Sequence, residues 1–248
     1  MNTTIKKSFS ISAILKRAWG LFKKHWQFLI LAALAVIAIE VVLAVLIENT
    51  PGILSVLFGL ASWIIQILYM IGFIYVFLSI AQDQNVGWDH FTKKAELFGK
   101  YFVGSILYSL GVIIGLALLI VPGIYFALTY GFWSYILVDK PNVGIFDSFK
   151  QSARITKNIK LKILGAAFVF AIIGVLGAIG LGIGLFVTIP LSAIATALMY
   201  VTLRDQSGLA GQSEATDDSS DIDEKSQDAD YNTIDGETAS DDEKTVNE

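Results

Sequence analysis

The stretch QFLILAALAVIAIEVVLAVLI, residues 27–47, has one ionisable side chain, Glu40, in 21 positions. An α-helix rises about 1.5 Å per residue, so a stretch of this length crosses the roughly 30 Å hydrocarbon core of a bilayer. The 26 residues before it are basic, and it has no small-residue cleavage signal. We therefore interpret it as a retained transmembrane helix and not as a secretory signal peptide.

Further along the chain, five more stretches have the same apolar character, at residues 53–80, 102–121, 124–138, 161–179 and 183–203. The fourth span is short and directly follows Pro122 and Gly123, so spans three and four either both cross or form a hairpin that crosses only in part. A hydrophobic fraction of 54% with 16% charged residues exceeds what a soluble domain usually carries. The sequence therefore predicts an all-α, polytopic membrane bundle with six transmembrane helices.

Lys and Arg residues occur in every second segment between the apolar stretches. Residues 1–26, 81–101 and 139–162 contain six, three and six of them, whereas the three short connections contain none. Because the cytoplasmic loops of membrane proteins are enriched in Lys and Arg, we expect the basic segments to face the cytoplasm. This distribution predicts a multi-pass protein of the cell (plasma or inner) membrane with both termini in the cytoplasm.

The basic segments also have the pattern of amphipathic helices. Residues 10–26 and 145–160 place apolar side chains at spacings of three and four, with charged side chains on the opposite face. A similar short helix is predicted after residue 87, which makes three cytoplasmic amphipathic helices in all. The apolar faces contain Ile11, Ile14, Leu15, Ala18, Phe22 and Trp26 in the first helix, and Ile145, Phe149, Ala153 and Thr156 in the last.

Basic side chains on these helices are candidate contacts for lipid headgroups. Each Lys or Arg near an anionic membrane surface contributes about 1 kcal/mol of attraction. A role in setting the topology is by itself enough to explain them, so both interpretations stay open. The candidates are Lys16, Arg17, Lys23, Lys24, Lys150, Arg154 and Lys157.

An internal repeat organises the chain. The tripeptide Asn-Val-Gly occurs at residues 85–87 and again, 57 residues later, at residues 142–144. Each copy precedes a predicted amphipathic helix, a span, a turn with Gly or Pro, and a second span. Residues 1–81 follow the same order without the tripeptide, so we predict three helix-plus-hairpin repeats that share one orientation.

The chain divides into two parts of opposite charge. Residues 1–205, the six-span domain, contain 16 Lys or Arg and 8 Asp or Glu, whereas residues 206–248 contain 2 and 14. The second part has few apolar residues, so burial cannot offset the entropy that ordering would remove. We therefore predict a disordered, acidic cytoplasmic tail at residues 206–248.

Glu40 is the one ionisable residue well inside a span, where a charge costs about 2.5 kcal/mol or more. Such a residue is a candidate functional site. The alternative is a protonated carboxyl that bonds a neighbouring helix for structural reasons. No Lys, Arg or His lies inside another span, away from its ends, to pair with Glu40, which argues against a relay of charges.

Small residues recur inside several spans. The pattern Gly111-x-x-x-Gly115 predicts close packing of helices within the bundle rather than a dimer interface. Five glycines between Gly174 and Gly184 predict a kinked or loosely packed outer hairpin. They do not form a nucleotide loop, because no strand precedes them and no P-loop Lys follows.

No pattern of a catalytic or cofactor site is visible. The chain has no Cys, which excludes thiolate metal sites and cysteine nucleophiles. His25 and His90 are far apart in the sequence and have no obvious third metal ligand. We therefore expect a protein that is not an enzyme, holds no cofactor or metal, and does not bind nucleic acid.

Around the fourth span the sequence resembles a known type of membrane protein. The residues that carry the resemblance are Val121-Pro122-Gly123-Ile124-Tyr125, Leu137-Val138-Asp139, Phe149-Lys150-Gln151-Ser152 and Thr156-Lys157. This pattern is similar to that of an uncharacterised family of bacterial multi-pass membrane proteins, and to the membrane domain of bacterial glycerophosphodiester phosphodiesterases. In those families a Ser-x-x-x-Thr-x-Gly helix follows the span, whereas this chain has Asn158 at the Gly position. The 43 residues of the tail, 206–248, are too few for a phosphodiesterase barrel, so the resemblance implies a membrane module and not the enzyme.

These features predict a non-enzymatic membrane module that binds or organises lipids or membrane proteins. A small-solute or lipid transporter is the alternative, and a Glu40 side chain that faced a wet cavity would support it. Small-residue faces packed within the bundle would support the binding module. The expected partners are membrane lipids and other membrane proteins, and the sequence leaves the oligomeric state open.

Overall fold

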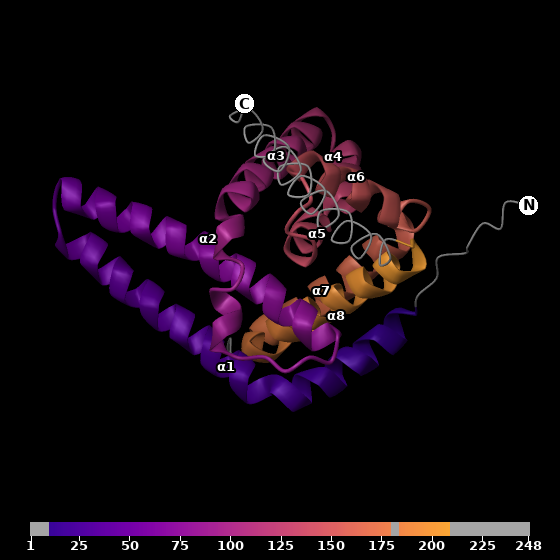
Figure 1. Ribbon diagram of the computed structural model, residues 1–248, viewed down its shortest axis with the longest axis horizontal. Helices are drawn as coiled ribbons and strands as arrows, with labels where there is room; N and C mark the ends of the chain where they lie inside the picture. Colours follow the sequence, from indigo (N-terminus) through magenta and orange to yellow (C-terminus); the bar gives the residue numbers. More distant parts are fainter. Residues whose placement is uncertain (1–9, 180–183, 209–248) are drawn as a thin grey trace, which may run out of the picture. The chain divides into compact units, whose positions relative to one another are not determined.

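The computed structural model describes residues 10–179 and 184–208, and every regular element in these ranges is helical (Figure 1). Six helical stretches in the described part are long and apolar enough to cross a membrane. The predicted all-α, six-span fold is confirmed. The elements are α1 Ile11–Asn49, α2 Ile53–Ala81, the 3-10 turns η1 Trp88–Phe91 and η2 Ala95–Leu97, α3 Phe98–Leu118, α4 Ile120–Tyr130, α5 Trp133–Asp139, α6 Ile145–Thr156, α7 Lys160–Ile179 and α8 Leu185–Gln206.

All of these elements belong to one unit of the chain, residues 1–207. α8 continues one residue past the predicted end of the membrane domain, to Gln206. Residues 209–248 of the predicted tail, and the connection at residues 180–182, lie outside the described residues. The disorder of the tail therefore stays a prediction.

The predicted N-terminal amphipathic helix is not a separate element, because α1 runs from it into the first span without a break. Neither Gly nor Pro is present between Lys24 and Leu29 to stop the helix. α1 changes direction along its length, so its first part lies beside α8 and its later part beside α2 (Figure 1). Ile14, Ala18 and Phe22 are buried in the protein, so this apolar face packs on other helices and not on the lipid surface.

The second predicted amphipathic helix forms the two 3-10 turns η1 and η2 instead of an α-helix. With three residues per turn, Trp88 and Phe91 lie on one side, and their rings are 5.4 and 6.5 Å from that of Phe28 in α1. Phe91 also packs edge-to-face on Phe73 of α2, at 5.0 Å. Gly72 makes room for this approach, since a methyl group added to it would lie 2.9 Å from the Phe91 Cα. These contacts to two separate helices favour the tighter turns.

α3 and α4 form a hairpin in which a single extended residue, Leu119, makes the turn. The predicted turn at residues 121–123 is instead the start of α4, where Pro122 is tolerated because the first helical turn needs no backbone donor. The two helices meet at Gly115 and Gly123, since a methyl group added to Gly115 would lie 2.8 Å from the Gly123 Cα. The small-residue pattern that ends at Gly115 therefore packs within the bundle, as predicted.

The fourth span consists of two helices, α4 and α5, because the helix is interrupted at Gly131 and Phe132. Hydroxyl groups of α6 bond the backbone at this interruption. Ser152 accepts a hydrogen bond from the Phe132 N–H at 3.2 Å and donates one to the Thr129 carbonyl oxygen at 2.9 Å. Thr156 donates to the same carbonyl oxygen at 3.1 Å. Both side chains are fully buried, so α6 completes the fourth span from inside the protein.

Replacing Ser152 with Ala is expected to lower the free energy of unfolding by about 2 kcal/mol, because the Phe132 N–H is left buried without an acceptor. The Thr129 carbonyl oxygen keeps its bond from Thr156. Ser148→Ala is the matched control, since Ser148 is equally buried one turn earlier and bonds only to Ile145 of its own helix. Thermal unfolding of both purified variants in detergent gives the comparison. Equal unfolding midpoints would contradict this role of Ser152.

α6 is the third predicted amphipathic helix, and its charged face is exposed as expected. Its buried face is rotated from the predicted one, because Ser148, Ser152 and Ile155 are buried while Phe149 is only half-buried. Thr156, which belongs to the predicted face, is fully buried as well. The chain leaves α6 through Asn158, whose φ of 69° is left-handed. Gly adopts this conformation freely and Asn more easily than most residues, so either residue suits the position that follows the Ser-x-x-x-Thr pattern.

α7 and α8 come into close contact next to the segment that connects them. A methyl group added to Gly184 would lie 2.7 Å from the Cα of Gly177. The hypothesis of a loosely packed outer hairpin is therefore wrong at these two glycines. α8 also contacts α1, α2 and α6, and its side chains Ile194, Ala197 and Leu203 are completely buried.

Candidate functional site

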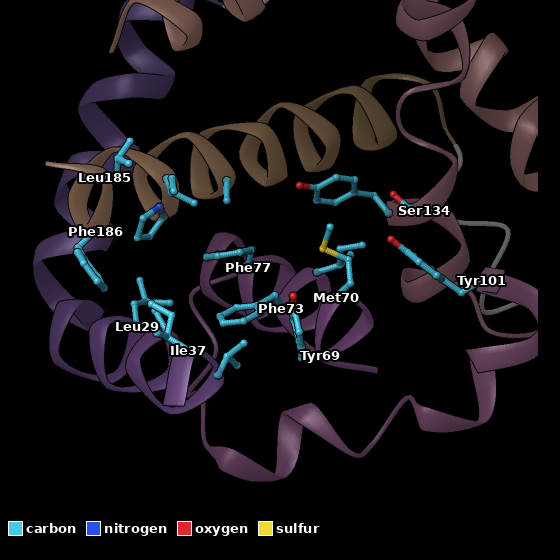
Figure 2. Close-up of a pocket in the computed structure, with 17 residues that line it drawn as sticks. Leu29, Ile37, Tyr69, Met70, Phe73, Phe77, Tyr101, Ser134, Leu185 and Phe186 are labelled. Carbon is cyan, nitrogen blue, oxygen red and sulfur yellow. The ribbon is translucent and has the colours of Figure 1, made fainter. Parts of the chain in front are cut away.

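A cavity of about 730 Å³ lies between α1, α2 and α8, with residues of α3 and α5 at one end (Figure 2). Its walls are apolar apart from a few hydroxyl groups, and among the residues that the structure describes no Lys, Arg, His, Asp or Glu lines it. A volume of this order falls in the range of about 300–1,000 Å³ that is typical of sites for small organic ligands. The cavity therefore offers room for an uncharged, mostly apolar molecule.

Each long wall of the cavity is one face of a helix. Among the α2 side chains that line it, Tyr69, Phe73 and Phe77 recur every four residues, and among those of α8 Leu185 and Ile189 do the same. Residues four apart lie one above the other on an α-helix, so each stripe points in one direction. The aromatic stripe of α2 faces the aliphatic stripe of α8 across the cavity.

Hydroxyl groups gather at the end of the cavity formed by α3 and α5. Figure 2 shows the oxygens of Tyr101 and Ser134 close together there and directed into the cavity. Tyr135 lines the same end, and Tyr69 enters from α2. Neighbouring aromatic rings hold Tyr101 and Tyr135, at centroid distances of 5.2 and 5.8 Å. Within the part of the chain that the structure describes, these four hydroxyls make no hydrogen bond.

Glu40, the predicted candidate functional residue, does not line this cavity. Its Oε2 accepts a hydrogen bond from the Ser62 hydroxyl of α2 at 2.9 Å, while its Oε1 is buried without a partner. This geometry agrees with the structural interpretation of Glu40 as a carboxyl bonded to a neighbouring helix. A functional role for Glu40 stays a prediction.

The seven predicted headgroup contacts are all exposed, on α1, on α6 and, for Lys157, directly after the end of α6. Arg17 lies 3.0 Å from Asp83, and Lys150 lies 3.1 Å from Asp147, but these pairs are more than half exposed and contribute little stability. Lys150 also lines a second hollow of about 500 Å³ between α3, α4 and α6. Exposure suits both headgroup binding and a role in topology, so the two interpretations stay open.

An ion pair that the sequence analysis did not single out joins α5 to α8. Arg204 Nη1 donates to both carboxylate oxygens of Asp139, at 3.1 and 3.0 Å, and the Tyr200 hydroxyl donates to the same carboxylate at 2.7 Å. The Arg204 and Asp139 side chains are only 17% and 14% exposed. We call this group the α5–α8 clamp. The sequence signal that could have pointed to this ion pair is the opposite charge of Asp139 and Arg204, which directly follow the fourth and sixth predicted spans.

The side chain of Lys140, directly after the clamp residue Asp139, is half-buried. Burial lowers the pKa of the Lys140 ammonium group, and the adjacent Asp139 carboxylate partly opposes this shift. Burial disfavours the charged form of a Lys, whereas a nearby carboxylate favours it. The chain therefore concentrates charges of both signs where α5 ends.

In residues 10–179 and 184–208, no group of three or more His, Cys, Asp or Glu side chains is placed to hold a metal ion. A scan against models of known protein families finds no match, and searches of curated proteins and of solved structures find none either. The resemblance to the membrane domain of the phosphodiesterases therefore stays a prediction, which rests on residues 121–157.

Proposed function

We propose that this integral membrane protein is a non-enzymatic module that binds lipid and holds the lipid's hydrocarbon chain in the cavity between α1, α2 and α8. The cavity is the observation that carries the proposal, through its volume of about 730 Å³, its apolar walls and its lack of charged side chains. Atoms that line an empty space lose dispersion contacts, so filling it with hydrocarbon is favourable. The surrounding bilayer supplies hydrocarbon chains of suitable chemistry.

The position of Glu40 and the close helix contacts elsewhere in the bundle favour binding over transport. A transport path is usually marked by ionisable side chains inside the membrane, and the one such residue in the first span, Glu40, bonds Ser62 and lies off the cavity. The glycine contacts between α3 and α4 and between α7 and α8 bring backbones together, as in a closely packed scaffold. Transport of a small solute or lipid therefore has less support than binding.

Placing Trp at Ala193, whose side chain lines the cavity on α8, is expected to remove most of the lipid that stays with the extracted protein. The larger side chain occupies the space in which the hydrocarbon chain is proposed to lie. Native mass spectrometry of the detergent-extracted protein measures the bound lipid. Ala33→Trp fills the same cavity from α1, so loss of lipid in both variants could not be explained by a local distortion of α8.

The matched control is Ala44→Trp, since Ala44 is exposed on α1 and does not line the cavity. We expect this variant to keep its lipid. If folded Ala193→Trp and Ala33→Trp retain as much lipid as Ala44→Trp, the cavity is not the lipid site.

We also propose that both termini face the cytoplasm of a bacterial inner membrane, because the Lys and Arg residues lie in alternate segments. A cysteine introduced at Asn49 is expected to react with a membrane-impermeant thiol reagent added to intact cells, and cysteines at Gln84 or Asn142 are not. All three positions are exposed, and the chain has no cysteine of its own. Labelling of the cysteine at position 142 from outside the cell would contradict the proposed orientation.

A further inference from the structure

The end of the cavity formed by α3 and α5 presents hydrogen-bonding groups without partners. Tyr101 and Ser134 direct their hydroxyls into the cavity there (Figure 2). Tyr135, the residue after Ser134 on α5, also lines the cavity, and none of the three hydroxyls is hydrogen-bonded within the described residues. A hydroxyl in apolar surroundings is unfavourable unless it finds a partner. A ligand with hydrogen-bond acceptors at this end would supply that partner.

The α5–α8 clamp keeps part of this end in place. The Tyr135 ring lies 5.8 Å from the ring of Tyr200, whose hydroxyl is bonded to Asp139. Tyr101 is held separately, by the ring of Trp133 at 5.2 Å. The two tyrosine rings are therefore positioned by the protein, and their hydroxyls remain available to a ligand.

The same end offers nothing to a charged headgroup. Within residues 10–179 and 184–208, no Lys, Arg or His lines the cavity, and the Arg204 guanidinium is already bonded to Asp139 and Asp205. A phosphate among these tyrosines would be buried without a counter-charge, which is strongly unfavourable. The surroundings therefore favour a polar group that is uncharged.

We propose that the hydroxyls of Tyr101, Ser134 and Tyr135 bind the carbonyl group of an uncharged lipid whose apolar chain fills the rest of the cavity. Ester carbonyls of a diacylglycerol and ring carbonyls of an isoprenoid quinone present the same acceptor to these donors. The aromatic stripe of α2, which includes Phe73, adds flat apolar surface beside the site. This inference rests on the proposed lipid-binding function and adds the chemical class of the lipid.

The test uses the full-length protein in detergent and three probes, namely a diacylglycerol, a quinone with a short isoprenoid tail, and phosphatidylglycerol. Native mass spectrometry measures how much of each probe is bound. We expect the wild type to bind one of the two carbonyl probes more tightly than phosphatidylglycerol, and the tighter one identifies the source of the carbonyl. Tyr101→Phe and Tyr135→Phe should each weaken binding of that probe about fivefold, the effect of one lost hydrogen bond.

Tyr125→Phe is the matched control, since Tyr125 is exposed and lies outside the cavity, and it should bind every probe as the wild type does. Preference for phosphatidylglycerol, or unchanged binding by the Tyr101→Phe/Tyr135→Phe double variant, would overturn the inference. If Ala193→Trp abolishes binding while the double variant binds normally, the cavity holds lipid but the hydroxyls do not select it. If Ala193→Trp and Ala33→Trp leave all binding intact, the proposed function itself fails.

Discussion

Replacing Gly115 with Leu is expected to lower the free energy of unfolding by roughly 3 kcal/mol or more, by forcing α3 and α4 apart. Leu is more apolar than Gly and forms helices better, so insertion of α3 into the membrane should not suffer. The loss arises at the helix crossing, where even one added carbon would lie 2.8 Å from the Cα and 3.1 Å from the nitrogen of Gly123. Backbone atoms cannot turn aside as the end of a flexible side chain does.

Gly59→Leu is the matched control for this substitution. Gly59 lies within the apolar helix α2, and an added methyl group there would meet no atom within 4 Å. We expect this variant to be as stable as the wild type or slightly more so. The measurements are the thermal unfolding midpoint in detergent and the amount of each variant in the membrane fraction. Equal midpoints for the two variants would contradict the close crossing of α3 and α4.

Asp139→Leu is expected to lower the free energy of unfolding by about 3 kcal/mol, because it leaves the Arg204 guanidinium in the α5–α8 clamp without its carboxylate. The two side chains are 17% and 14% exposed, so some solvent reaches them and the lower end of the range for buried pairs applies. Tyr200 loses its acceptor in the same variant. Denaturant unfolding in detergent measures the change.

The double variant Asp139→Leu/Arg204→Leu tests the coupling within the clamp. Removing both charges leaves none buried alone, so we expect the double variant to be more stable than Asp139→Leu. Asp147→Ala is the exposed control, since Asp147 and Lys150 form a pair with 62% and 77% exposure, and its cost should stay within about 0.5 kcal/mol. If the double variant lost as much stability as the two single variants together, the side chains of Asp139 and Arg204 would not be coupled and the clamp would be contradicted.

The spans could be predicted from the sequence because a membrane allows few alternatives. Every backbone group in the hydrocarbon core must be paired, so each crossing is a long apolar helix that hydropathy alone reveals. α2 begins at Ile53 and α7 ends at Ile179, both as predicted. Hydropathy does not show where a helix stops when both sides of a boundary can be helical. The continuity of α1 through Trp26 was missed for that reason.

The features that were not predicted depend on residues that are distant in the sequence. η1 forms where Phe91 packs on Phe73, and the interruption of the fourth span relies on Ser152, 20 residues after Phe132. The cavity draws side chains from five helices, and its tyrosines have no local pattern that separates them from other aromatic residues of a span. Glu40 could be singled out from the sequence because it is a carboxylic acid within an apolar span. Its hydrogen-bond partner Ser62 could not be predicted, because it lies 22 positions away.

The hydroxyl bonds from α6 to the interrupted fourth span also set an order on biosynthesis. A ribosome adds roughly 5–20 residues per second, so Ser152 is made about 1–4 s after Phe132. Through that interval the Phe132 N–H lacks the hydroxyl acceptor that it has in the finished protein. The backbone at the interruption of the fourth span is therefore fully hydrogen-bonded only after α6 has been made, so the second predicted repeat is completed by a helix of the third.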